Sequence, residues 1–273
     1  MRPALALVLT VPVSECELAS DALWALGVAA VEERIVDDAF VELWTSLGDD
    51  SVAVTREAEA FPTRWRWRVV ELDPSVADSW RRHATPTWIE RDLVVVPAWI
   101  DADVAAGTIR LDVDPGAAFG LGDHPTTVLS ARLLRAAWWP GATVLDVGTG
   151  SGVLAVLAAR LGAPYVRAID VSAAALDAAT ANAARNGVAA VVDVSGDPVA
   201  AVGDAFDVVV ANLLAPILVD LAPELRRVTA PAGALVVSGV LEHAHGHVLE
   251  ALAPMKPVET VTKDGWAAVL LRH

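Results

Sequence analysis

The stretch from Val144 to Ala155 constrains the fold more than any other part of the chain. In it, an apolar strand passes through an acid, Asp146, into a glycine-rich turn and then into an alanine-rich helix. Three glycines alternate in this turn: Gly148, Gly150 and Gly152. Such glycines let the backbone pass close under a ligand, and the N-terminal end of the next helix offers free N–H groups and a partial positive charge. We therefore expect a small-molecule site here.

The spacing of the glycines and the acid before them indicate which ligand binds. A dinucleotide fingerprint, G-x-G-x-x-G, would place its last glycine at position 153, which is Val153. This spacing argues against a nicotinamide dehydrogenase. A carboxylate at Asp146 suits a ligand that carries a positive charge, and the ammonium of S-adenosylmethionine (SAM) supplies one.

A second acid follows at the distance that a nucleotide-binding unit requires. The apolar run over residues 165–169 ends in Asp170, 20 positions after Gly150. An acid at the tip of the second strand accepts hydrogen bonds from the two ribose hydroxyls. Joined to Asp146 and the strand-helix-strand spacing, Asp170 favours a SAM site over a glycine cluster without a ligand.

Strand and helix patterns alternate through the second half of the chain, which is typical of a mainly parallel sheet with helices on both faces. The patterns predict helices over 128–137, 152–161 and 173–186, strands over 190–194, 206–211 and 234–239, and a terminal hairpin over 259–271 around Asp264-Gly265. Ligands in such α/β folds bind at the carboxyl ends of the strands, beside the switch in strand order. At the third strand tip, Asp197 could reach the adenine amino group. At the fourth, Asn212 should face the cofactor's methyl group, although it could instead cap the helix opened by Pro216.

Residues 1–72 have a separate pattern that predicts a small β-α-β-β-α-β domain. Its strands are expected over 4–11, 28–36, 39–44 and 64–70, with a helix opened by Ser14. In the last strand, arginines at positions 64, 66 and 68 alternate with apolar residues. This basic side could dock nucleic acid or substrate, or it could be the solvated side of a half-buried strand.

Two further segments connect these domains. A linker helix is expected over 73–83, followed by short strands over 93–96 and 108–113 that bridge into the second domain, which starts near residue 116. Residues 114–127 are too rich in glycine and proline for regular structure. A loop of this kind just before a helix can fold over a bound cofactor, although it could also be an ordinary interdomain turn.

Composition limits the partners and the compartment. A formal net charge of -15 opposes a nucleic-acid backbone and favours a basic partner, unless the acidity serves only solubility. A single cysteine, Cys16, has no partner for a disulfide, which fits a reducing cytoplasm. No apolar run approaches the length of a membrane span, so no membrane partner is expected. His243, His245 and His247 lack a carboxylate or thiol at metal-ligand spacing, so we expect no metal.

Two segments carry a resemblance to a known family. The run D-P-G-A-A-F-G-L-G-D-H-P-T-T over 114–127 and A-N-L-L-A over 211–215, with the glycine loop and Asp170, resemble the PrmA family, bacterial methyltransferases of large-subunit ribosomal protein eleven. The resemblance runs from about residue 93 to residue 266. It implies a seven-stranded class I SAM-dependent methyltransferase sheet over 116–273, preceded by a ferredoxin-like substrate-recognition domain.

The resemblance also implies an activity and its residues. The family trimethylates amino groups, so lysine or N-terminal amines of a ribosomal protein would be the acceptors. Asn212 and Leu213 would stand at the active centre. Four residues of the loop would lie beside SAM: Phe119, His124, Thr126 and Thr127. One departure is Leu121, where the family usually has threonine and a polar contact to the cofactor is therefore missing.

The acceptor is the most open part of this interpretation. The amino-terminal domain, which would choose the substrate, matches the family only in its element order. Another protein, a peptide or a small amine could therefore be the acceptor. A SAM-binding regulator without catalysis is an alternative of a different class. The side-chain amide of Asn212 argues against it, because a protein that only binds SAM needs no hydrogen-bond acceptor beside the methyl group. Oligomeric state is left open.

Overall fold

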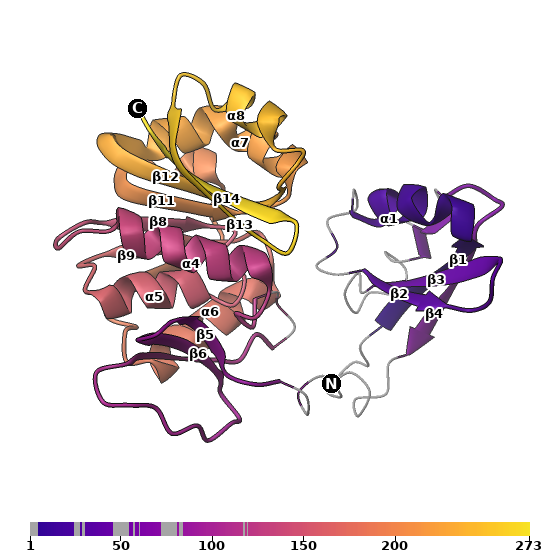
Figure 1. Ribbon diagram of the computed structural model, residues 1–273, viewed down its shortest axis with the longest axis horizontal. Coiled ribbons are helices and arrows are strands. Elements are labelled where there is room, and N and C mark those ends of the chain that lie inside the picture. The colour runs from indigo at the N-terminus through magenta and orange to yellow at the C-terminus, as the bar shows by residue number, and fades with distance from the viewer. Residues whose placement is uncertain are drawn as a thin grey trace. The chain divides into compact units, whose positions relative to one another are not determined.

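A computed structural model describes residues 5–24, 28, 31–45, 55–56, 58–59, 61–71, 81, 84–116, 118 and 120–273. The chain divides into two compact units, residues 1–84 and residues 85–273 (Figure 1). Each unit has its own buried apolar core. The units are therefore described separately.

The smaller unit is an antiparallel sheet with the strand order β2-β3-β1-β4. Its elements are β1 (Leu5–Pro12), α1 (Cys16–Trp24), β2 (Glu32–Ile35), β3 (Phe40–Thr45) and β4 (Arg66–Glu71). Helical residues at 55–56 and 58–59 lie between β3 and β4 in sequence. The described elements thus follow the expected β-α-β-β-α-β order.

Two of the three alternating arginines in and just before β4 pair with acids. Arg68 donates to Glu42 at 2.8 Å, and Arg64 donates to Glu15 at 2.8 Å. The guanidinium of Arg34 lies 4.0 Å from the ring centre of Trp44. Trp44 and Glu42 both belong to β3. On the opposite side, Leu7, Leu9, Leu43 and Trp65 form the core of this unit. The structure therefore favours the solvated side of a half-buried strand over a basic docking face.

The larger unit is built on a seven-stranded sheet in the order β10-β9-β8-β11-β12-β14-β13. The strands are β8 (Val144–Val147), β9 (Val166–Ile169), β10 (Val192–Ser195), β11 (Phe206–Asn212), β12 (Thr229–Leu241), β13 (Lys256–Lys263) and β14 (Trp266–Arg272). Neighbours from β10 to β12 pair in parallel, and β14 runs antiparallel to both β12 and β13. This order confirms the class I methyltransferase fold, with the switch in strand order between β8 and β11.

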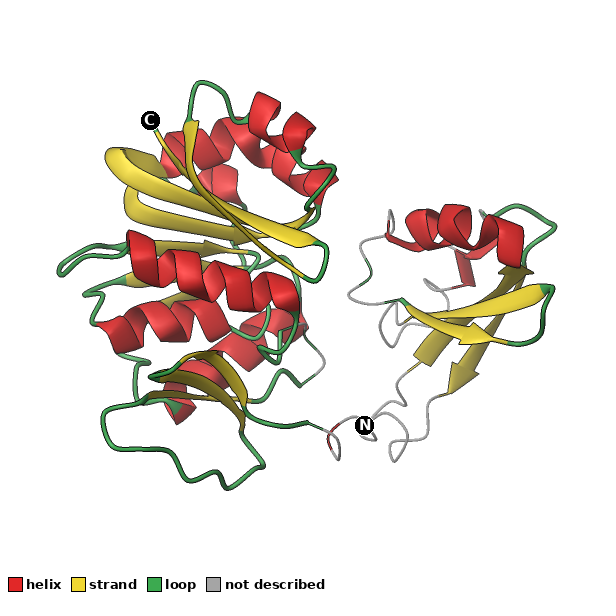
Figure 2. Ribbon diagram, viewed as in Figure 1, coloured by secondary structure: helices red, strands yellow, loops and turns green. Residues whose placement is uncertain are grey.

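Helices cover both faces of this sheet (Figure 2). They are α4 (Pro125–Ala137), α5 (Val153–Leu161), α6 (Ala173–Arg185), α7 (Ala215–Val228) and α8 (Gly246–Ala251). Alternation along the strands sends one set of side chains, such as Val208 and Val210, into the core with α4 and α5. The other set, such as Val209 and Ala211, packs with α7. Asn212 continues the first set, so its position belongs to the α4 and α5 face.

The expected bridge between the domains is part of the larger unit, which corrects the boundary near residue 116. A separate three-stranded sheet contains β5 (Thr87–Glu90), β6 (Leu93–Pro97) and β7 (Ile109–Val113). Its apolar residues Ile89, Leu93 and Leu111 are buried in the same core as α4 and α5. The burial of these side chains is the reason that the unit starts near residue 85. The expected linker helix over 73–83 lies almost entirely outside the described residues.

Candidate active site

The glycine loop has the backbone that its sequence predicts. Gly148, Gly150 and Gly152 all have left-handed φ angles, of 71°, 53° and 80°. A Cβ on Gly148 would lie 2.3 Å from Cδ2 of Leu213, and one on Gly152 would lie 2.8 Å from Cα of Ala179. Gly148 therefore lets the loop approach the end of β11, while Gly152 lets α5 pack against α6.

Asp146 lies beneath this loop, with 1% of its surface exposed. Its Oδ2 accepts a hydrogen bond from the hydroxyl of Thr149 at 2.6 Å and from the backbone N–H of Ala155 at 3.2 Å. Burial raises the pKa of Asp146 to about 6, against the opposing effect of these two hydrogen bonds. The carboxylate thus holds the start of α5 in place. Its expected contact with a ligand ammonium stays a prediction.

Asp170 is tied directly to the glycine loop. Its Oδ2 accepts from the backbone N–H of Gly150 at 2.9 Å, and its Oδ1 accepts from the N–H of Ser172 at 2.9 Å. A carboxylate oxygen has room for a second donor, so the half-buried Asp170 keeps acceptor capacity for a ligand. The structure therefore brings together the two acids and the three glycines that the sequence singled out.

Asp197 is held by a different set of contacts. Its Oδ2 accepts from Nη2 of Arg167 and from the hydroxyl of Ser195, both at 2.6 Å. The side chain is about half exposed, just beyond the tip of β10. An adenine amino group would share this carboxylate with a cation and a hydroxyl. The contact with adenine stays a prediction.

The N-terminal end of α4 carries the histidine and threonines of the loop. His124 is the N-cap residue, and its Nδ1 accepts from the N–H of Thr126 at 3.3 Å. Its ring meets that of Trp266 edge to face, with ring centres 5.2 Å apart. Burial lowers the pKa of His124. The hydroxyl oxygen of the buried Thr127 has no hydrogen-bond partner among the described residues, while the predicted contact residue Phe119 lies outside them.

Asn212 does not cap the next helix. β11 ends at Asn212, and the N-cap residue of α7 is Leu214, without a side-chain hydrogen bond. Within the described part of the chain, the half-buried amide of Asn212 makes no hydrogen bond. The capping alternative is therefore wrong, and a donor and an acceptor stand uncommitted at the carboxyl end of β11.

Leu213 is fixed by its neighbours on both sides. Its backbone N–H donates to the carbonyl oxygen of Ser238 at 3.0 Å. A Cβ on Gly239 would lie 2.2 Å from the carbonyl oxygen of Leu213, so β12 approaches this peptide as closely as a glycine allows. The backbone around the Leu213 carbonyl is thus held in one position.

Ser238 is a site residue that the sequence reasoning missed. It is fully buried and pairs with Asn212 in the parallel register of β11 and β12. Its hydroxyl lies 3.3 Å from the carbonyl oxygen of Thr126 and 3.1 Å from that of Ala267. Ser238 therefore joins the end of β12 to α4 and to β14. A signal was present, because Ser238 directly follows the apolar run over 234–237, much as Asn212 follows the apolar residues of its strand.

The glycine- and proline-rich loop over residues 114–127 makes hydrogen bonds to residues of α6 and of the glycine loop. Asn182 donates to the carbonyl oxygens of Asp114 and Ser151 at 2.9 and 2.8 Å. The hydroxyl of Ser151 donates to the carbonyl oxygen of Gly120 at 2.5 Å. Residues 85–273 form one unit, so the interdomain-turn alternative is wrong. Asn182 gave no signal in the sequence, since it lies inside an alanine-rich helix.

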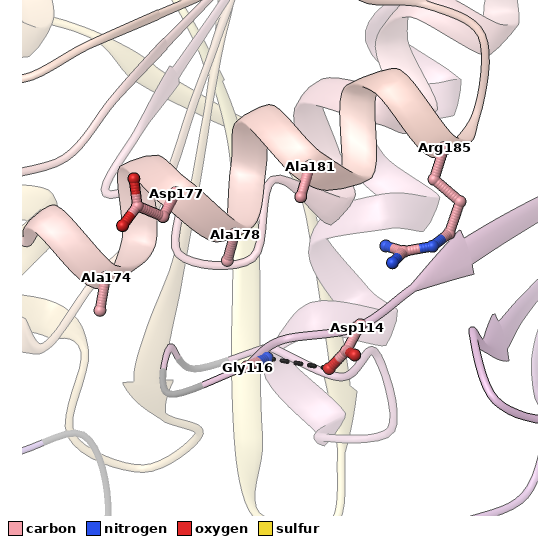
Figure 3. Close-up of a pocket in the computed structure, with 7 residues that line it drawn as sticks. All are labelled: Asp114, Gly116, Ala174, Asp177, Ala178, Ala181 and Arg185. Carbon is pink, nitrogen blue, oxygen red and sulfur yellow. Dashed lines mark hydrogen bonds between the residues drawn. The ribbon is translucent and has the colours of Figure 1, made fainter. Parts of the chain in front are cut away.

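A pocket of about 340 Å³ lies between the start of this loop and one face of α6 (Figure 3). The residues that line it are Asp114, Gly116, Ala174, Asp177, Ala178, Ala181 and Arg185. None of the residues predicted to hold the cofactor is among them. The pocket is therefore lined by residues other than those predicted to hold the cofactor.

Two kinds of feature are absent from the part of the chain that the structure describes. It contains no helix long and apolar enough to span a bilayer. It also contains no group of three histidine, cysteine, aspartate or glutamate side chains that could hold a metal ion. His245 is instead the N-cap residue of α8.

Comparison with known proteins identifies related sequences and a related structure. The family profile described as "Ribosomal protein L11 methyltransferase (PrmA)" matches residues 40–273. The ribosomal protein L11 methyltransferase of Symbiobacterium thermophilum is 43% identical over 211 residues, 77% of this chain and 68% of that protein. That of Pelotomaculum thermopropionicum is 44% identical over 199 residues, 72% of this chain and 65% of that protein. The chain thus matches about two thirds of the length of these relatives.

A solved structure agrees with these sequence matches. The crystal structure of ribosomal protein L11 methylase from Lactobacillus delbrueckii subsp. bulgaricus has a TM-score of 0.65 and 34% identity, over 70% of this chain and 100% of that chain. The profile match spans most of the sequence and includes the glycine loop, Asp170 and Asn212. This chain therefore belongs to the ribosomal protein L11 methyltransferase (PrmA) family.

Proposed function

We propose that this protein transfers methyl groups from SAM to lysine or N-terminal amino groups of ribosomal protein L11. The observation that carries the proposal is the uncommitted amide of Asn212 at the carboxyl end of β11, beside a glycine loop that is tied to Asp170. Relatives that share this part of the chain are named for the same substrate. A ribosomal substrate and a single cysteine both fit the reducing cytoplasm.

The residues present fit SAM. Asp170 keeps acceptor capacity for the ribose hydroxyls, and the left-handed glycines leave the backbone uncovered at the start of α5. The buried, unpartnered hydroxyl of Thr127 is a polar group that a ligand can satisfy. SAM supplies a methyl group on a positively charged sulfur. Leu121 supplies no hydroxyl to this ligand where the family usually has one.

The protein's main task is to position a neutral amine, because a single displacement in line with the sulfur needs little acid-base chemistry. A lysine amine with a pKa of about 10.4 must lose a proton at pH 7, which requires about 4.6 kcal/mol unless desolvation lowers its pKa. The side-chain oxygen of Asn212 and the carbonyl oxygen of Leu213 would accept the N–H groups of the amine and so hold it neutral and oriented for transfer. Burial lowers the pKa of His124, which favours a neutral imidazole at pH 7.

The proposal is tested by methyl transfer from isotopically labelled SAM to purified ribosomal protein L11 from the source organism. We expect label in the protein and a mass increase in steps of one methyl group on lysine or the N-terminus. A lysate from the same organism, labelled in parallel, tests the alternative acceptors. If the label appears on another protein, a peptide or a small amine and not on ribosomal protein L11, the proposed substrate is wrong. SAM binding without any methyl transfer would favour a non-catalytic SAM-binding regulator.

The cofactor assignment is tested by titration calorimetry with SAM and NAD. We expect binding of SAM alone. Asp170→Ala should weaken SAM binding by ~1 to 3 kcal/mol, because the ribose hydroxyls lose a charged acceptor. Asp204→Ala, at an exposed acid between η3 (Val199–Ala201) and β11, serves as the matched control. An unchanged SAM dissociation constant in Asp170→Ala would remove Asp170 from the site.

A further inference from the structure

The contact between Trp266 and His124 joins the C-terminal hairpin to the threonine end of α4. We propose that Trp266 is a positioning residue for methyl transfer, which acts by fixing the ring plane of His124 and, through it, the first turn of α4. This inference rests on the proposed function for its kinetic test. Its structural basis lies in contacts that involve neither the cofactor nor the acceptor.

Trp266 stands where three strands and the helix meet. It is the first residue of β14 and pairs with Leu241 on β12 and with Lys263 on β13. The next residue, Ala267, offers its carbonyl oxygen to the hydroxyl of Ser238 at 3.1 Å. The side chain of Trp266 is half-buried against the core that contains α4 and α5. Backbone pairing thus fixes the position from which the indole reaches His124.

Thr126 and Trp266 both contact the ring of His124. Its Nδ1 lies 2.8 Å from the hydroxyl oxygen of Thr126 and accepts from the N–H of the same residue. The indole of Trp266 meets the imidazole at an interplanar angle of 66°, the edge-to-face arrangement that aromatic rings prefer. The hydrogen bond sets the direction of Nδ1, and the indole restricts rotation of the ring about its bond to Cβ. Loss of the indole would remove this restriction on the ring that carries Nδ1.

The cap matters to the site because α4 begins inside it. When Nδ1 accepts from the N–H of Thr126, it satisfies one of the free donors at the helix start. The carbonyl oxygen of Thr126 lies 3.3 Å from the hydroxyl of Ser238, the register partner of Asn212. A displaced first turn would therefore disturb both the threonines and the end of β12. These contacts connect Trp266 to Asn212, whose amide we assign to binding the acceptor amine.

A double-mutant cycle separates this role from simple core packing. We expect Trp266→Leu to lower kcat at saturating SAM by ~10-fold or more, and Trp266→Phe to restore it to within ~3-fold of wild type, because an aromatic edge returns. His124→Asn keeps a side-chain cap but removes the ring. If Trp266 acts through His124, Trp266→Leu added to His124→Asn should lower kcat by less than ~2-fold further. Fully multiplicative losses would overturn the proposal.

The control and the second readout keep the two proposals distinguishable. Trp88→Leu, at a half-exposed tryptophan on β5 of the same unit, should leave kcat unchanged. The NMR signals of the His124 ring protons should move in Trp266→Leu, because the ring current of the indole is lost. Unmoved His124 signals would overturn the positioning role even if the wild-type protein methylates nothing. Should Trp266→Leu fail to fold, Trp266→Met takes its place in the cycle and in the NMR measurement, and kcat losses that multiply would overturn the proposal.

Discussion

Asn212 is the residue whose two interpretations, contact with the acceptor amine and capping of the next helix, can be told apart by where that helix begins. The structure places the N-cap of α7 at Leu214, so the amide of Asn212 is left without a structural duty among the described residues. A polar side chain that is half-buried and uncommitted at the end of a parallel strand is a candidate for ligand or substrate contact. Its replacement should therefore affect chemistry more than folding.

We expect Asn212→Ala to lower turnover by ~100-fold or more while SAM affinity changes little, because the lost interaction is with the reacting amine. The unfolding free energy should change by less than ~1 kcal/mol, since no cap is lost. Initial rates at saturating SAM, calorimetry and urea unfolding measure the three quantities. Full turnover in this variant would remove Asn212 from the mechanism.

Asn212→Asp is the sharper variant of the same position. It keeps an acceptor but adds a negative charge, which favours the protonated and unreactive amine. We expect normal folding and SAM binding, poor methyl transfer at pH 7 and partial recovery as the pH rises. A pH-rate profile compared with that of wild type checks this. A constant ratio of the two rates at every pH would contradict a role in holding the neutral amine.

Asp146 gives a prediction about stability and pH. Burial raises its pKa from 3.8 to about 6 in the folded protein, so the folded state binds this proton more tightly than the unfolded chain does. The resulting stabilisation is fully present below about pH 3.8 and is lost as the pH rises through about 6. We expect Asp146→Asn, which keeps an acceptor for the N–H of Ala155 and cannot ionise, to exceed wild type in stability at pH 7.5 by up to ~3 kcal/mol.

The measurement is urea unfolding of both proteins between pH 5 and pH 8. The advantage of Asp146→Asn should shrink as the pH falls toward 5. A variant that is less stable than wild type at pH 8 would show that the start of α5 stabilises the ionised carboxylate. SAM titration of Asp146→Asn tests the predicted contact between Asp146 and the cofactor ammonium. Loss of that contact would weaken SAM binding without lowering the free energy of unfolding.

At the scale of elements, the sequence predicts those parts of the site where a strand pattern is interrupted. The glycine loop, Asp170 and Asn212 were identifiable because glycines or polar residues break apolar strands at their carboxyl ends. Asn182 was not, because its role depends on the backbone of Asp114, which lies 68 positions away in the sequence. Similarly, the membership of β5, β6 and β7 in the larger unit depends on which core buries their apolar side chains, and periodicity does not encode that choice.

Close packing at the end of β12 gives the prediction at this scale. Gly239 and Gly107 share a left-handed φ of 88°, so alanine is strained at both. A Cβ at Gly239 would lie 2.2 Å from the carbonyl oxygen of Leu213, whereas one at Gly107 meets nothing within 4 Å. We expect Gly239→Ala to displace the Leu213 peptide, with a loss of turnover of ~100-fold or more and a larger loss of stability than in Gly107→Ala.

Gly107→Ala serves as the matched control for backbone strain, with an expected destabilisation of ~1 to 3 kcal/mol and near-normal turnover. Urea unfolding and initial rates compare the two variants. Equal turnover in both would mean that the position of the Leu213 carbonyl does not matter for the reaction.

For the whole molecule, the two units have separate cores, and the features assigned to cofactor and catalysis all lie in residues 85–273. We therefore expect a fragment of residues 85–273 to fold cooperatively and to bind SAM with an unchanged dissociation constant. Selection of the protein acceptor is assigned by resemblance to the smaller unit, so methylation of ribosomal protein L11 by the fragment should be lost. Circular dichroism, calorimetry and label transfer test these outcomes in turn.

A short peptide with a free N-terminus, used as the acceptor, separates substrate recruitment by the smaller unit from methyl transfer by the larger unit. If the smaller unit only recruits the protein substrate, the fragment and the full chain should methylate this peptide at similar rates, because Asn212 and Leu213 are present in both. If the fragment folds but binds SAM weakly, residues 1–84 support the cofactor site as well. If it methylates ribosomal protein L11 as fast as the full chain does, acceptor choice lies in the larger unit, and the loop over residues 114–127 becomes the first place to search for it.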